Sequence, residues 1–192
     1  ILSVFNKFKD IIMNKVRCSW VGKDPLYIQY HDKEWGVPLY EDQQLFEFLI
    51  LETFQAGLSW ITVLRKRENF RKAFDNFDYV KISNYGQQKF DELLSNAGII
   101  RNRLKIKATF ANAISFMEVQ KEFGSFSKYI WSFVNGKPLR NKWKLNNDVP
   151  ANTELSDVIS KDLKKRGFKF VGTTVIYAYM QATGMINDHT TN

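Results

Sequence analysis

The chain has 192 residues, of which 44% are hydrophobic and 15% aromatic, and its 28 basic and 20 acidic residues give a formal net charge of +8. This composition excludes a disordered chain and predicts a globular protein of one domain, which buries roughly 70% of its unfolded surface. The positive charge favours a polyanionic partner, nucleic acid ahead of a membrane surface, although solubility alone is an equal explanation.

The N-terminal residues 1–16 alternate apolar residues with lysines over too short a span to cross a membrane, and they lack the features of a signal peptide. We therefore treat them as an N-terminal extension of unknown role, with Met13 as an alternative start. The single cysteine, Cys18, cannot form an intramolecular disulfide. A cytoplasmic location without a membrane partner is expected.

Capping residues, prolines and glycines predict the starts and ends of helices along almost the whole chain. Asp24 followed by Pro25 places proline directly after a capping residue, and it opens a short helix that Gly36 ends. Ser59 is expected to cap a later helix. No strand alternation and no fixed repeat is visible, so the predicted fold is all-α. The remaining helices are expected at about 60–74, 90–97, 106–117, 125–134, 156–166 and 173–183, with a polar surface loop at 135–153.

One helix places a carboxylate on its apolar side. Asp42 is expected to cap this helix, on which Leu45, Leu49 and Glu52 recur on one face. A buried carboxylate without a partner is costly. Glu52 must therefore meet a partner, give up its charge, or face a cavity in which a ligand supplies the partner.

The segment NAGIIRN at 96–102 joins two amphipathic helices and forms a loose helix-hairpin-helix pattern over about 87–117. Backbone N–H groups in such a hairpin, here at Gly98, can hold a DNA phosphate without reading the base sequence. An ordinary connection between two helices is the alternative. Positive charge beside the hairpin is supplied by Arg101, Arg103, Lys105 and Lys107.

Five blocks of the sequence together resemble the DNA-3-methyladenine glycosylase I family. The blocks are RCSWVGKDPLYIQYHDKEWGVP, LETFQAGLSWITVLRKREN, NAGIIRNRLKI, YIWSFVNGKP and KKRGFKFVGTTVIYAYMQATGMINDH. They occur in the family's order and cover nearly everything from Arg17 to His189. The resemblance implies a helix-hairpin-helix glycosylase domain over 17–192, with a helical core at about 41–170 and a zinc-binding annex formed by 17–36 and 184–192.

The resemblance also implies a monofunctional base-excision-repair enzyme without lyase activity. Such an enzyme flips 3-methyladenine out of alkylated double-stranded DNA, hydrolyses its N-glycosidic bond and releases the free base. The methylated base is cationic and leaves as a neutral group, so the pocket must recognise it rather than protonate it. A monomer is expected. The alternatives are a glycosylase for a wider range of damaged bases and a non-catalytic helix-hairpin-helix DNA-binding module.

In the family's pattern, Glu52 accepts hydrogen bonds from the base and favours its positive charge, which makes it the candidate catalytic residue. Trp60 matches the tryptophan that stacks on the base, and Tyr27 and Tyr30 match tyrosines that line the pocket. Without the resemblance, aromatic residues at helical spacing would be assigned to the core.

The turn between Glu52 and Trp60 matches the segment that enters the gap left by the flipped nucleotide. Its candidate wedge residues are Gln55, Gly57 and Leu58, and the glycine allows close approach to the duplex. Gly57 can also serve as the end of a helix, and the two roles are compatible.

Zinc is implied by the same resemblance, because the family ties its two ends together with two cysteines and two histidines. Cys18, His31 and His189 fall on matching ligand positions, although spacing alone indicates no metal motif. The sequence ends at Asn192, before the position of the second cysteine. We expect structural Zn²⁺ with the fourth family ligand absent, and we expect Asp188 to lie at a helix end or to support the neighbouring ligand rather than to act in catalysis.

Overall fold

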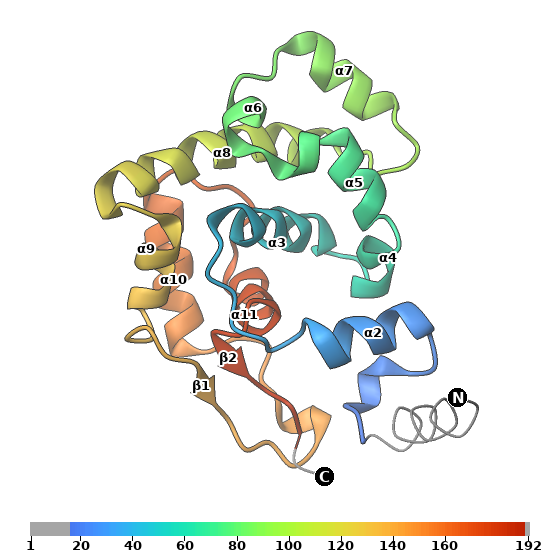
Figure 1. The fold of residues 1–192 in the computed structure, drawn as a ribbon, viewed down its shortest axis with the longest axis vertical. Coiled ribbons are helices and arrows are strands. Elements are labelled where there is room, and N and C mark those ends of the chain that lie inside the picture. The colour runs from blue at the N-terminus through green and yellow to red at the C-terminus, as the bar shows by residue number, and fades with distance from the viewer. Residues whose placement is uncertain (1–15, 191–192) are drawn as a thin grey trace, which may run out of the picture.

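The structure is a computed structural model that describes residues 16–190. It is mainly helical, as expected from the sequence (Figure 1). All of the predicted N-terminal extension except Val16 lies outside the described residues. The α-helices are α2 (Pro25–Lys33), α3 (Asp42–Gln55), α4 (Trp60–Leu64), α5 (Arg67–Ala73), α6 (Tyr79–Ser83), α7 (Gln87–Ser95), α8 (Arg103–Phe123), α9 (Phe126–Ser132), α10 (Glu154–Lys165) and α11 (Thr173–Ala182). Short 3₁₀ turns occur at η1 (Ser19–Val21), η2 (Asp75–Phe77) and η3 (Asn146–Asp148).

The predicted all-α fold agrees with this mainly helical structure, which adds two strands of two residues each. Strands β1 (Leu139–Arg140) and β2 (Ile186–Asn187) pair in parallel. The backbone N–H of Leu139 donates to the carbonyl of Met185 at 2.9 Å. Two-residue strands are too short to show an alternating pattern, and this pairing joins part of the predicted surface loop to the C-terminal segment.

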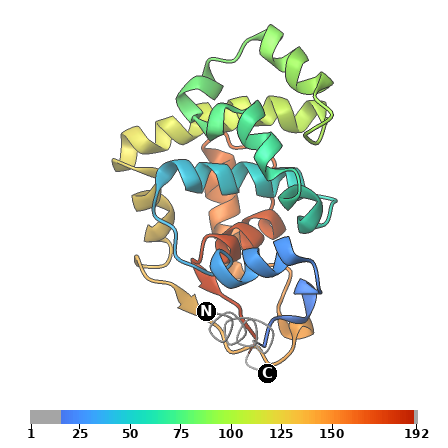
Figure 2. The same cartoon turned by 45° about the vertical axis from the view of Figure 1, so that its right-hand side comes forward.

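Helix α3 lies at the centre of the molecule and packs against α11, α8 and α4 (Figures 1 and 2). Every residue from Leu45 to Phe54 is buried. A helix that is covered on all sides is buried whatever its amphipathic pattern. The burial of Glu52 therefore follows from the central position of α3.

Of the two predicted aspartate caps, the structure confirms one and contradicts the other. Asp24 caps α2 as predicted, because its carboxylate accepts hydrogen bonds from the backbone N–H groups of Leu26 and Tyr27. The prediction that Asp42 caps its own helix is wrong. Its carboxylate instead accepts from the backbone N–H groups of Phe126 at 2.9 Å and Ser127 at 2.7 Å, so it stabilises the start of α9.

The predicted helix at 60–74 is interrupted between α4 and α5. Ser59 occupies the N-cap position, but its hydroxyl pairs with the Thr62 hydroxyl at 2.8 Å and makes no capping bond to the backbone. Helix α2 ends at Lys33, before Gly36. None of the helices in the described part of the chain has the length and apolar character needed to cross a bilayer.

Candidate active site

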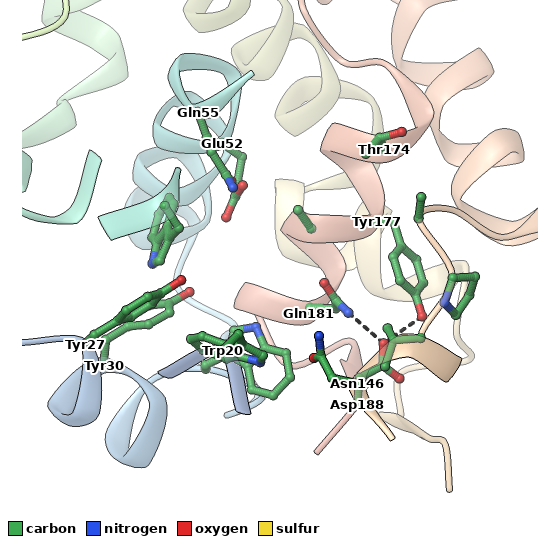
Figure 3. A pocket seen from close by; sticks show the side chains of 16 residues that line it. Trp20, Tyr27, Tyr30, Glu52, Gln55, Asn146, Thr174, Tyr177, Gln181 and Asp188 are labelled. Carbon is green, nitrogen blue, oxygen red and sulfur yellow. Dashed lines mark hydrogen bonds between the residues drawn. The ribbon is translucent and has the colours of Figure 1, made fainter. Parts of the chain in front are cut away.

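A pocket of about 360 Å³ opens between α2, α3, α4 and α11, with residues 146–151 forming a further wall. Figure 3 shows side chains from these elements converging on it. Five of the residues predicted from the sequence line this pocket: Tyr27, Tyr30, Glu52, Gln55 and Trp60. The structure therefore brings together residues that are far apart in the chain.

Glu52 lies in the last turn but one of α3 and is only 3% exposed. One carboxylate oxygen, Oε2, is buried and has no hydrogen-bond partner. Burial raises the pKa of Glu52 to about 8, since removal from water disfavours the charged form. Of the fates expected for this carboxylate, two are combined: it faces a cavity, and it holds a proton at neutral pH.

The aromatic wall beside Glu52 comes from α2 and α4. The Tyr30 and Trp60 rings have centroids 5.3 Å apart, and the buried indole N–H of Trp60 has no hydrogen-bond partner. Burial is the larger cause that raises the pKa of both Tyr27 and Tyr30, and the negative charge of nearby Glu52 is the second cause. Both phenols therefore remain protonated and can donate hydrogen bonds.

Sequence reasoning missed two tryptophans that line the pocket, Trp20 and Trp35. The Trp20 ring lies 4.9 Å from that of Tyr27 and 5.0 Å from that of Trp35. Both tryptophans belong to the first block that carries the family resemblance. No helical spacing indicated them, because Trp20 lies in a 3₁₀ turn and Trp35 follows the end of α2.

The opposite side of the pocket was also missed. Helix α11 contributes residues at helical spacing, which would have indicated one shared face. The loop at 135–153 was expected only at the surface, and part of it instead closes the pocket. These additional lining residues are Thr174, Tyr177, Ala178 and Gln181 from α11, and Asn146, Val149, Pro150 and Ala151 from the loop.

Asp188 stands across the pocket from Glu52 and is 1% exposed (Figure 3). Its Oδ1 accepts hydrogen bonds from Asn141 Nδ2 at 2.7 Å and from Trp143 Nε1 at 2.8 Å. Its Oδ2 accepts from the Tyr177 hydroxyl at 2.6 Å and from Gln181 Nε2 at 2.8 Å. Asp188 thus joins the loop, α11 and the C-terminal segment, a larger role than the predicted support of one neighbouring residue.

The turn between α3 and α4 lies beside the pocket. Gly57 has φ +83° and follows the C-cap residue Ala56, which agrees with its predicted role at a helix end. A Cβ atom at Gly57 would meet no atom within 4 Å, so the backbone angle rather than crowding requires glycine. Leu58 is 42% exposed at the tip of this turn.

The predicted hairpin at 96–102 joins α7 to α8, away from the pocket lining. The N–H of Gly98 donates to Asn96 Oδ1 at 2.8 Å. Arg101 is exposed. Lys105 is not surface charge beside the hairpin as expected, because it points into the protein and is 6% exposed.

The three expected zinc ligands lie near one another. The rings of His31 and His189 have centroids 4.8 Å apart, and Cys18 is buried and accepts a hydrogen bond from Thr190 Oγ1 at 3.8 Å. His31 Nε2 is buried without a hydrogen-bond partner, and its Nδ1 pairs with Asp32 at 2.9 Å. A thiol and two imidazoles suit zinc chemically. However, no group of three or more His, Cys, Asp or Glu side chains within residues 16–190 is arranged to hold a metal ion.

Known proteins resemble this chain over most of its length. The sequence model of the family described as methyladenine glycosylase matches residues 20–192. The chain is 50% identical to DNA-3-methyladenine glycosylase 1 of Escherichia coli (strain K12), over 90% of this chain and 92% of that protein. It is also 50% identical to DNA-3-methyladenine glycosylase of Haemophilus influenzae, over 90% of this chain and 94% of that protein.

Solved structures agree with the sequence comparison. A crystal structure of 3-methyladenine DNA glycosylase I matches with a TM-score of 0.90 and 50% identity, and the match covers 92% of this chain and 97% of that one. A variant of the same kind of enzyme in complex with 3-methyladenine matches with a TM-score of 0.89 and 36% identity, over 92% of this chain and 95% of that one. The fold is therefore that of a DNA glycosylase. The chain belongs to the methyladenine glycosylase family.

Proposed function

We propose that this chain, a DNA-3-methyladenine glycosylase by its family, recognises the flipped 3-methyladenine through the buried carboxylate of Glu52. The observation that carries the proposal is Oε2 of Glu52, which is buried without a partner in an aromatic-lined pocket. A related enzyme has been solved in complex with 3-methyladenine. A ligand that supplies positive charge and hydrogen-bond donors removes the cost of burying this group.

The charge of the base provides the selectivity. In DNA, 3-methyladenine is cationic, and a cation in the pocket favours the ionised form of Glu52 and lowers its pKa. Ordinary adenine is neutral and offers no such compensation, so Glu52 stays protonated beside it and the attraction between opposite charges is absent. The aromatic faces of Tyr27, Tyr30 and Trp60 then hold the base, and the protonated phenols of the two tyrosines donate hydrogen bonds to it.

Bond cleavage is hydrolytic in this proposal. Water attacks the sugar carbon as the neutral base leaves, both electrons of the glycosidic bond go to the base, and the attacking water loses one proton to solvent. A lyase reaction would need an amine nucleophile that forms a Schiff base. No lysine is among the residues that line the pocket in the described part of the chain, which supports a monofunctional enzyme.

The DNA duplex approaches at the turn beside the pocket. Gln55, Gly57 and Leu58 fill the gap left by the flipped nucleotide, which agrees with the exposure of Leu58 and the open space around Gly57. Arg101 contributes positive charge toward a phosphate. One chain acts alone on double-stranded DNA in the cytoplasm.

Zinc has a structural role in this proposal. Cys18, His31 and His189 would hold the ion and tie the annex segments 17–36 and 184–192 together beside the helical core at 41–170. Zn²⁺ binding in such a site stabilises the fold. The contact between the Cys18 thiol and the His31 imidazole supports this assignment. Metal analysis of gently purified protein is expected to find zinc, and metal-free protein of full stability would contradict it.

The experiment that tests the function is chromatography of the bases released from methylated duplex DNA. The wild type is compared with Glu52→Gln, which keeps the shape of the side chain and removes its charge. Release of 3-methyladenine is expected to slow by about 100-fold or more, the scale for losing one preorganised electrostatic contact. Undiminished release by a folded variant would remove Glu52 from the centre of the mechanism. Release of 7-methylguanine at a similar rate would indicate the wider substrate range.

A further inference from the structure

Lys105 is the one lysine among the buried polar residues in the part of the chain that the structure describes. It lies in the first turn of α8 and does not line the base pocket. Its ammonium donates to the backbone carbonyl of Phe54 at 2.9 Å and to that of Ala56 at 2.7 Å. Lysine is almost never buried this deeply unless its charge is paired, so these two carbonyls require an explanation.

Both carbonyls belong to the C-terminal end of α3. The last carbonyls of a helix have no partner within the helix and carry partial negative charge, so a cation there is favourable. At its own position Lys105 is unfavourable, because the first turn of α8 carries the opposite partial charge. The position of this lysine is therefore explained by α3 and the turn that follows it.

Among residues 16–190, no acidic side chain forms an ion pair with Lys105. Burial is the only cause that lowers the pKa of Lys105, and burial is also the only cause that raises the pKa of Glu52. The two groups are thus not an ion pair. Within residues 16–190, the ammonium of Lys105 donates to the backbone on either side of Gln55.

The turn that follows has few other contacts that would fix it. Gly57 has open space where a side chain would be, and Leu58 is 42% exposed. The N–H of Leu58 donates to the carbonyl of Gln55 at 2.6 Å, a bond within the turn itself. The proposed base-holding aromatic residues, Tyr27, Tyr30 and Trp60, lie on α2 and α4.

We propose that Lys105 is a positioning residue that fixes the turn carrying Gln55, Gly57 and Leu58, and so couples the start of α8 to the insertion of this turn into DNA. The inference rests on the proposed role of the turn as a wedge. It assigns Lys105 to the flipping step, in which the turn replaces the extruded nucleotide. Recognition of a base that is already free does not use Lys105.

The test compares Lys105→Met with Lys121→Met. The first removes the ammonium and keeps most of the side-chain volume. The second removes a lysine of the same helix whose side chain is 68% exposed and pairs with Glu118. Each variant is assayed for single-turnover release of 3-methyladenine from methylated duplex DNA, for binding of free 3-methyladenine and for binding of undamaged duplex DNA.

Lys105→Met is expected to release the base about 10- to 100-fold more slowly, the scale for losing hydrogen bonds to a buried charged group, while it binds the free base and undamaged DNA like the wild type. Lys121→Met is expected to match the wild type in all three assays. Lys105→Arg, which keeps charged donors, is expected to recover most of the rate. Hydrogen exchange of the Gly57 and Leu58 amides is expected to rise in Lys105→Met without a general rise elsewhere.

Equal losses of free-base binding and release in Lys105→Met would overturn the inference, since Lys105 would then support the pocket. A general rise in hydrogen exchange, or failure to fold, would overturn it in favour of a role in overall stability. An unchanged release rate in Lys105→Met, with an active wild type, would overturn this inference alone. Absence of release by the wild type would overturn the proposed function and this inference with it.

Discussion

Two buried carboxylates face the same pocket, and their surroundings are opposite. Glu52 is 3% exposed and leaves one oxygen without a partner, whereas Asp188 is 1% exposed and accepts four hydrogen bonds. A buried carboxylate that already has its donors stabilises the structure around it. A buried carboxylate that lacks them is set up for a ligand. Burial alone does not distinguish the two roles, but the count of donors does.

The largest effect on stability is expected at Asp188. Asp188→Ala would leave Asn141, Trp143, Tyr177 and Gln181 without their common acceptor. We expect the free energy of unfolding to fall by about 3–5 kcal/mol, as for the loss of one partner from a buried charged network. Urea unfolding measures the change.

The matched control for this prediction is Asp91→Ala, because Asp91 is exposed and bonds only to Gln87 one turn away, at 2.8 Å. It is expected to change the free energy of unfolding by less than about 0.5 kcal/mol. Equal effects of the two substitutions would contradict a special role for Asp188 in holding the loop, α11 and the C-terminal segment together.

The next largest effect is a pH dependence of the free energy of unfolding, which is expected from Glu52. The folded protein raises the pKa of Glu52 from 4.5 to about 8, so folding favours the protonated form. Its contribution to stability is complete below pH 4.5 and is lost as the pH rises toward 8. Between these two pH values the free energy of unfolding falls by about 1.4 kcal/mol per pH unit.

Glu52→Gln removes this titration. The variant is therefore expected to gain stability relative to the wild type as the pH rises, with the largest difference near the folded pKa of about 8. Urea unfolding of both proteins across this range measures the difference. Parallel pH profiles of the two proteins would show that Glu52 is ionised in the empty pocket.

The smallest effect is expected from removing one donor to Asp188. Trp143→Phe keeps the aromatic ring and deletes the indole N–H that bonds to Oδ1 at 2.8 Å. Three donors remain, so the free energy of unfolding is expected to fall by about 1.5–3 kcal/mol, less than for Asp188→Ala. A loss as large as that of Asp188→Ala would mean that packing of the Trp143 ring, rather than the hydrogen bond, holds the loop.

Local signals in the sequence predicted the parts of the fold that depend on neighbouring residues. The Asp24 and Pro25 pair marked the start of α2 because the cap acts within one turn. Asp42 carries the same capping signal, but it serves α9, which is distant in sequence. A sequence pattern cannot distinguish a carboxylate that caps its own helix from one that caps another.

The same division applies to the pocket. The family resemblance indicated Glu52, Tyr30 and Trp60, and the structure places all three in the lining. The wall at 146–151 has a polar, loop-like sequence, and the loop is held over the pocket by contacts with residues distant in sequence, which are the pairing of β1 with β2 and the bonds to Asp188. The sequence likewise predicts Lys105 as surface charge, because its carbonyl partners lie far away in the sequence.

The central claim is that Glu52 is a buried carboxylate without compensation in the empty pocket. Titration of the Glu52 side-chain carboxyl by carbon-13 NMR tests it most directly, and the Glu52→Gln spectrum identifies the resonance by its absence. The account predicts an apparent pKa of about 8 for the free protein. A value near 4.5, the ordinary value for glutamate, would contradict it, because the pocket would then already supply the partner that the base is proposed to bring.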